Sequence, residues 1–314
     1  MAMRKGAKKK RGEFPILISF FPPFPLCKHN TQAIAIPVHA HRLSLHLFCL
    51  KWHFLLFKCT GTGAGGQPQI PDNVELYQPY EGDQITLPER AQCLAVKAFL
   101  KMCDIPFRIK LRSNAEQMSP SGAVPFIKAG ADIVSEFDPI VEYISKKGLS
   151  LSEELSGGQK SEMKAYMALS INRLYLAEIY LAWNVKKTAD EITKQRYGSP
   201  FPWPLSLILP FLKQREAISY LKAHNSWHDF LPDQVYDEVN LCCKALSDKL
   251  GEQQYFFLDR PTELDALVYG HLKTLQIMEA EDQRLADMVN KYPTLVRFCD
   301  QIRERYFIER ERSR

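Results

Sequence analysis

The chain has 314 residues, of which 46% are hydrophobic and 25% are charged, and this length is enough for two ordinary domains with a buried core. Its formal net charge of +5 is unevenly placed, because residues 1–70 carry ten lysines and arginines against one acid. Residues 71–314 carry 31 basic and 35 acidic residues, and this slightly acidic body argues against non-specific nucleic-acid binding, which needs a basic face.

The first seventy residues open with a basic run, MAMRKGAKKKRG, and contain an apolar run, LSLHLFCLKWHFLLF, that is broken by two histidines and a lysine. The apolar run is too short to span a bilayer comfortably. A basic presequence or membrane anchor is one interpretation, since termini rich in Lys and Arg can target mitochondria. The other, which we adopt, is a non-globular extension over residues 1–70, joined through the flexible GTGAGGQP.

The eight cysteines form neither a CxxC pair nor a zinc-ligand spacing. In a chain of this size that pattern predicts free thiols in a reducing compartment. Five of the eight histidines precede residue 60 without a repeated ligand pattern, so no metal site is expected.

Residues 71–149 alternate between strand and helix patterns. Val74–Tyr77 predicts a short strand, Ala91–Met102 predicts a helix with one apolar side, and residues 106–111 alternate as a second strand. Residues 119–144 then predict a turn, an apolar strand, a tight return, a second strand and a helix from about Asp138. Gly148 is expected to end that helix in a left-handed conformation.

This order resembles the thioredoxin-like N-domain of glutathione transferases. There the proline before the third strand is cis, and Pro125 is the matching residue. The resemblance implies a catalytic hydroxyl or thiol near the end of the first strand and a Glu-Ser pair that binds the glutamyl carboxylate. The nucleophile position falls on Arg90, and the pair falls on Glu136-Phe137. Catalysis would therefore have to use Tyr77 or Cys93, each of which also fits a packed core position.

Residues 150–314 predict a helical domain after a polar link. Met163, Met167, Leu174, Ala177 and Leu181 step along one helix face, which is typical of core and also of adaptable partner surfaces. No apolar span precedes the charged C-terminal run RERYFIERERSR, so a C-terminal anchor is not expected.

The segment RYGSPFPWPL, at 196–205, cannot be helix interior because its prolines lack the N–H group. It predicts a rigid extended segment that presents Phe201 and Trp203, either to a partner or within a buried crossover. Further on, Thr262 and Asp265 have the spacing of a capping box, a folding element rather than a catalytic one. His271 on the same helix is expected to be a packed histidine.

Several segments are similar in sequence to the metaxin family, in order and over roughly 72–310. They are LYQ at 76–78, AVKAFLKMCDIPF, NAEQMSPSGAVPFI at 114–127, EMKAYMAL at 162–169, RYGSPFPWPL and PTELDALVYGHL. The resemblance implies a glutathione-transferase-like fold, α/β followed by all-α, without enzymatic activity or cofactor. It also implies a peripheral place on the cytosolic face of the mitochondrial outer membrane. There the protein would act with a metaxin-1-like subunit and the β-barrel subunit of the sorting and assembly machinery in protein import.

Three hypotheses follow. The first is this binding subunit, with Phe201, Trp203, Met163 and Met167 as candidate partner contacts. The second is a glutathione-dependent transferase that uses Tyr77 or Cys93. The third is a transferase-like module in a cytosolic complex unrelated to membranes.

Overall fold

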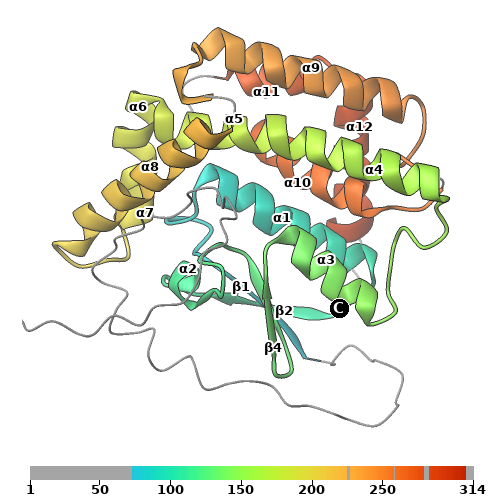
Figure 1. Cartoon of the computed structure of the whole chain (residues 1–314), viewed down its shortest axis with the longest axis horizontal. Coiled ribbons are helices and arrows are strands. Elements are labelled where there is room, and N and C mark those ends of the chain that lie inside the picture. The colour runs from blue at the N-terminus through green and yellow to red at the C-terminus, as the bar shows by residue number, and fades with distance from the viewer. Residues whose placement is uncertain (1–72, 225–226, 258, 279–282, 309–314) are drawn as a thin grey trace, which may run out of the picture. The chain divides into compact units, whose positions relative to one another are not determined.

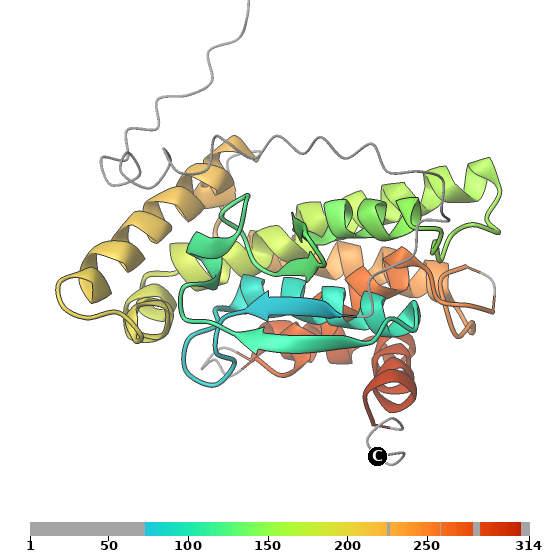
Figure 2. The ribbon, with the colours of Figure 1, turned by 90° about the horizontal axis from the view of Figure 1, so that it is seen from below.

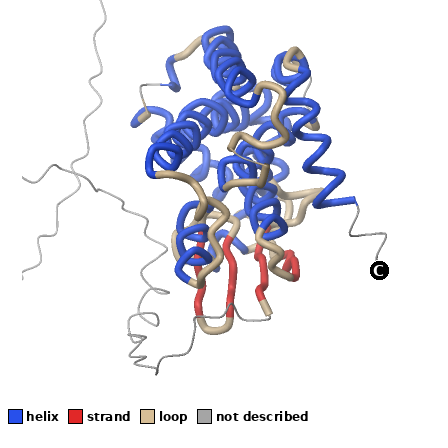
Figure 3. Tube along the Cα trace, turned by 90° about the vertical axis from the view of Figure 1, so that its right-hand side faces the viewer, coloured by secondary structure: helices blue, strands red, loops and turns tan. Residues whose placement is uncertain are grey.

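The computed structural model describes residues 73–224, 227–257, 259–278 and 283–308 (Figure 1). The predicted extension over 1–70 lies outside these residues. Among them, the strands gather at one end and the helices stack beside them, as Figure 3 shows. The α/β part followed by an all-α part is the predicted fold class.

The sheet has four strands in the order β2-β1-β3-β4. They are β1 (Val74–Gln78), β2 (Phe107–Leu111), β3 (Phe126–Ala129) and β4 (Asp132–Ser135). Strand β1 runs parallel to β2 and antiparallel to β3, and β4 returns antiparallel to β3. The Val124–Pro125 peptide bond before β3 is cis, at the residue to which the sequence assigned this geometry.

Helices α1 (Leu87–Met102) and α3 (Phe137–Lys146) pack on the sheet face that buries Val74 and Leu76. The short α2 (Ala115–Met118) belongs to a second, smaller apolar cluster that includes Phe126. Helix α1 begins four residues earlier than its apolar pattern predicts, because Thr86 and Glu89 form a capping box at its start. Gly148, with φ of 87°, follows α3 as the predicted left-handed residue.

The helical part continues from α4 to α12. The helices are α4 (Gly157–Ser170), α5 (Leu176–Ile179), α6 (Lys186–Thr188), α7 (Lys194–Gly198), α8 (Leu205–Ala223), α9 (Pro232–Leu250), α10 (Glu263–Gln276), α11 (Arg284–Asn290) and α12 (Pro293–Ile302). Wider π-helical turns cover Ile171–Tyr175, Tyr180–Asn184, Ala189–Thr193 and Arg303–Ile308, and Trp227–Asp229 forms a 3₁₀ turn.

Helix α10 lies against α1, and this contact joins the sheet-bearing part to the helical part (Figure 1). Every residue from Glu263 to Leu272 is buried. The approach of the two helices is close because Gly270 has no side chain: a Cβ there would lie 2.6 Å from the Ala91 carbonyl oxygen and from the Ala95 Cβ. Small residues on both helices therefore set this distance.

Deleting residues 1–70 should leave this fold intact, because the sheet begins at Val74 and its strands pair with one another. Thermal melting of the truncated and full-length chains checks this expectation. A melting temperature lower by more than about 4 °C would mean that the extension contributes more than about 1 kcal/mol to stability.

Candidate functional site

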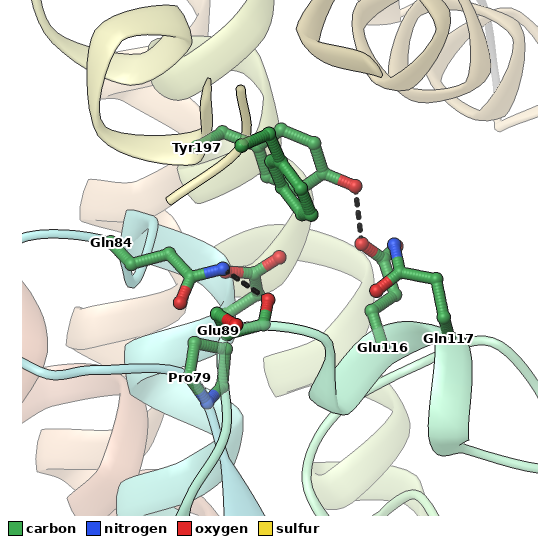
Figure 4. A pocket seen from close by; sticks show the side chains of 8 residues that line it. Pro79, Gln84, Glu89, Glu116, Gln117 and Tyr197 are labelled. Carbon is green, nitrogen blue, oxygen red and sulfur yellow. Dashed lines mark hydrogen bonds between the residues drawn. The ribbon is translucent and has the colours of Figure 1, made fainter. Parts of the chain in front are cut away.

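A small cavity lies beyond the carboxyl end of β1 (Figure 4). Its volume is about 10 Å³, which is about the space that a single water molecule needs. It is lined by Pro79, Gln84, Glu89, Ser113, Glu116, Gln117, Tyr197 and Phe201. A tripeptide does not fit into this space.

Side chains from both parts of the chain surround this cavity. Glu116 on α2 accepts hydrogen bonds from the Tyr197 hydroxyl, at the end of α7, and from the Lys213 ammonium on α8. Figure 4 shows Tyr197 reaching toward Glu116 across the cavity. Beneath them, the Glu89 carboxylate accepts from the Thr86 amide at 3.0 Å, which completes the cap of α1. These contacts hold α7 and α8 against the sheet-bearing part.

The positive charge of Lys213 and the negative charges of Glu89 and Glu116 attract one another, and none of these groups is arranged to activate a thiol. Desolvation, with the like charge of Glu116, raises the pKa of Glu89. Desolvation alone would lower the pKa of Lys213, but the carboxylates of Glu116 and Glu89 outweigh it and raise that pKa. Lys213 therefore stays charged and balances the negative charge of the acids. Burial, and after it the negative charge of Glu116, raises the pKa of the Tyr197 hydroxyl.

Neither of the two remaining candidates for catalysis is placed to stabilise a thiolate. The Tyr77 hydroxyl donates to Glu75 Oε2 at 2.8 Å, and this hydrogen bond raises the pKa of Tyr77. Its ring stacks on Phe126 with 4.7 Å between ring centroids. Cys93 is 1% exposed, and burial raises the pKa of its thiol, so the reactive thiolate form is disfavoured.

The positions that the resemblance assigns to glutathione binding have other roles. Arg90 donates to the Glu81 carbonyl oxygen at 3.4 Å. Phe137, in the place of the carboxylate-binding serine, is 3% exposed and packs edge-on against Phe99 at 5.9 Å between centroids. Its ring therefore belongs to the core, and the hydroxyl that a transferase needs is absent.

Of the two candidate partner contacts on α4, one is buried and the other is partly exposed. Met163 is 4% exposed and lies in the hydrophobic core, and Met167 packs against that core while partly exposed. The step of three and four residues along α4 therefore marks a core face, as such a stripe often does. Met163 therefore offers almost no surface to a partner.

The proline-rich segment differs from its predicted extended form. Residues 196–198 end α7 and Leu205 begins α8, so only 199–204 form a turn, which starts where the Phe201 amide donates to the Gly198 carbonyl at 3.0 Å. Phe201 is partly buried because its ring packs against Tyr197, 6.4 Å between centroids, and lines the cavity. Trp203 is the exposed member of the pair, at 81%.

The predicted capping box at the start of α10 is present. The Asp265 carboxylate accepts from the Thr262 amide at 2.7 Å and from the Phe256 amide at 3.0 Å. The Thr262 hydroxyl also donates to Asp265 at 2.7 Å. Asp265 is 0% exposed, so this cap fastens a helix start inside the protein.

His271 is buried, as predicted, and contacts an acid that the sequence analysis missed. Its Nδ1 lies 2.9 Å from Glu178 Oε1, and both side chains are 0% exposed. Burial raises the pKa of Glu178. The pair joins α5 to α10 within the core.

Three further properties bear on function. No three His, Cys, Asp or Glu side chains of the described residues converge where they could hold a metal ion. The helices within the described ranges also include none with the length and apolarity to cross a bilayer. The described cysteines are free thiols.

Comparison with known proteins places the chain. A profile of the glutathione S-transferase N-terminal domain matches residues 91–188, and one of the glutathione S-transferase C-terminal domain matches residues 239–302. Metaxin-2 of Homo sapiens is 49% identical over 244 residues, which cover 78% of this chain and 92% of that protein. The chain belongs to the metaxin family. Metaxin-1 of Mus musculus is more distant, at 30% identity over 68% of this metaxin-family chain and 69% of the relative.

Solved structures agree on the fold of this metaxin. The β-etherase LigF of Sphingobium sp. aligns with a TM-score of 0.51 at 17% identity, over 76% of this chain and 98% of that one. Glutathione transferase GSTFuA3 of Phanerochaete chrysosporium aligns with a TM-score of 0.50 at 13% identity, over the same shares. At such low identity the likeness shows the fold alone, which is that of the glutathione transferases.

Proposed function

We propose that this metaxin is a non-enzymatic subunit of the sorting and assembly machinery of the mitochondrial outer membrane. In this role it acts in protein import and β-barrel insertion, together with a metaxin-1-like partner and the β-barrel subunit. It is peripheral, on the cytosolic face, and its partners hold it there. The family to which the chain belongs supports this role.

The observation that carries the proposal is the state of the positions that the resemblance assigns to glutathione chemistry. Phe137 is buried in the core where a transferase has its carboxylate-binding serine, and Cys93 is a buried thiol whose pKa is raised. The scaffold is then available for binding proteins, because a fold does not fix a function and the site does.

Affinity purification from detergent-solubilised mitochondria tests the proposal. A metaxin-1-like subunit and an outer-membrane β-barrel protein are expected to co-purify with the tagged full chain. Alkaline carbonate should release the chain from mitochondria, as it releases peripheral proteins. Recovery in a complex that contains neither subunit would favour the module in a cytosolic complex instead.

The glutathione-dependent transferase remains the alternative function, and we expect its activity to be absent. The purified chain should neither be retained on glutathione resin nor conjugate glutathione to a standard electrophile above the uncatalysed rate. The reason is that Phe137 removes a hydroxyl and Cys93 is buried as a thiol. Conjugation that is lost in Tyr77→Phe or in Cys93→Ala would establish the alternative.

A further inference from the structure

An exposed apolar surface lies on α8 and on the turn that precedes it. Six of the seventeen large hydrophobic residues that are exposed in the described part of the chain fall within the ten residues 203–212. They are Trp203 (81% exposed), Leu205 (44%), Leu207 (67%), Ile208 (46%), Phe211 (55%) and Leu212 (49%). We call this surface the α8 ridge. Exposed apolar surface gathered in this way marks a protein or membrane interaction site rather than ordinary scatter.

The ridge is the outer face of a helix whose inner face is already packed. Pro210, Ala217 and Leu221 are the buried residues of α8, and the ridge residues lie on the other side. In Figures 1 and 2 this helix, coloured gold, lies at the margin of the helical part. The ion pair between Lys213 and Glu116, and the hydrogen bond from Tyr197 to Glu116, hold α8 and the end of α7 against α2. The ridge is therefore presented on a fixed support.

The charges around the ridge indicate what it contacts. The sixteen residues 197–212 contain no charged side chain. Farther along α8 the exposed charged residues are Arg215, Glu216 and Lys222, two basic and one acidic, and Arg215 lies over the Phe211 ring at 6.0 Å. The Glu216 carboxylate lies 4.0 Å from the ammonium of Lys213, a second base on its own helix.

An apolar stretch followed by basic residues matches the layers of an anionic bilayer, in which hydrocarbon lies beneath phosphates. Interfacial helices combine Trp, Phe and Leu on one face with Lys and Arg toward the headgroups. An indole prefers the headgroup level, where its ring is apolar and its N–H is hydrated. Trp203 occupies the end of the ridge, and basic side chains near the surface are attracted to anionic lipids.

We propose that the α8 ridge inserts into the headgroup region of an anionic lipid bilayer, with Arg215 and Lys222 at the phosphates. The chain then has a direct lipid contact of its own, in addition to the partners that the proposed function gives it. The contact does not depend on those partners, so it can be tested with the purified full chain alone.

The main test measures quenching of Trp203 by lipids brominated on their acyl chains, in phosphatidylcholine vesicles with and without phosphatidylserine. The chain has four tryptophans, of which Trp183 and Trp227 are 2% and 0% exposed. Comparing Trp52→Phe with Trp203→Phe therefore assigns the quenched residue. We expect Trp52→Phe to be quenched by the anionic vesicles and Trp203→Phe to lose most of that quenching.

A pair of matched variants tests whether the ridge produces the contact. Leu207→Glu with Phe211→Glu changes two exposed ridge residues. Leu231→Glu with Leu241→Glu changes two residues of α9 or its start that are 67% and 60% exposed. The ridge variant should lose Trp203 quenching and bind vesicles at least about tenfold more weakly, whereas the α9 variant should behave as wild type. Circular dichroism and melting confirm that both are folded.

The role of Arg215 and Lys222 is tested by comparing binding to anionic and to neutral vesicles. Arg215→Gln with Lys222→Gln should bring binding to anionic vesicles down toward that to neutral ones, while binding to neutral vesicles is unchanged. Quenching of Trp203 that persists in the ridge variant would overturn the proposal, as would an equal loss in the α9 variant. If the ridge variant keeps its vesicle binding but no longer captures the metaxin-1-like subunit, the ridge is a protein-docking surface and the lipid proposal is wrong.

Discussion

Gly270→Ala should destabilise the folded chain by about 3 kcal/mol or more, at the upper end of the cost of overpacking a core. The added Cβ would lie 2.6 Å from the Ala91 carbonyl oxygen, the Ala95 amide nitrogen and the Ala95 Cβ. Two of these atoms are backbone, so no side-chain rotation relieves the overlap. The helices α1 and α10 must move apart, which opens the contact between the sheet-bearing and helical parts.

Gly158→Ala is the matched control, because Gly158 is also helical and a Cβ there meets nothing within 4 Å. It should be neutral or slightly stabilising, since alanine favours a helix over glycine. Urea unfolding followed by circular dichroism measures both variants. Similar stability of Gly270→Ala and wild type would mean that α1 and α10 approach less closely than described.

The sequence predicts the sheet-bearing part well because strand and turn signals are local. The β1 strand and the return between β3 and β4 follow from alternation and from Gly130, whose φ is 65°. Gly270 also leaves a signal: a glycine inside a predicted helix costs about 1 kcal/mol relative to alanine, so a close packing partner is expected. The sequence does not show which helix packs on Gly270; that it is α1, through Ala91 and Ala95, depends on the tertiary structure.

The filled cavity could not be predicted, because its contacts join residues far apart in sequence. Glu116 and Lys213 are 97 residues apart, and the sequence around neither residue indicates the other as its partner. Glu178 gave a partial signal, since one acid within the apolar run LYLAEIYLAW indicates a buried partner. That the partner is His271, 93 residues later, comes from the packing of α5 on α10.

The turn at 199–204 decides between the two alternatives that the sequence leaves open for Phe201 and Trp203. Alternating prolines and aromatics indicate an extended strand, but the Ser206 amide donates to the Pro202 carbonyl at 3.1 Å and the segment turns. The turn directs Phe201 toward Tyr197 and leaves Trp203 outside. The prolines predict that residues 199–204 are not helical, whereas packing against Tyr197 determines that Phe201 rather than Trp203 is buried.

Asp265→Ala should cost about 3 kcal/mol at acidic pH, because it leaves the buried amides of Phe256 and Thr262 without acceptors, at about 1–3 kcal/mol each. The same box position on α4 is Gln159, whose hydrogen bond to the Ser156 amide is exposed. Gln159→Ala should cost about 1 kcal/mol or less, since water replaces the lost acceptor. If both variants lost the same free energy of unfolding, burial would not explain the contribution of the α10 cap to stability.

The loss in Asp265→Ala should also depend on pH. Burial raises the pKa of Asp265 from its ordinary value of 3.8 to about 7. Between about pH 4 and pH 7 the folded chain keeps a proton that the unfolded chain releases, so wild type loses stability as the pH rises through this window. The variant lacks the group, and the stability gap should therefore be larger at pH 5 than at pH 8. Urea unfolding at both values measures it, and a gap that widens toward pH 8 would mean that the three hydrogen bonds to the carboxylate outweigh its burial.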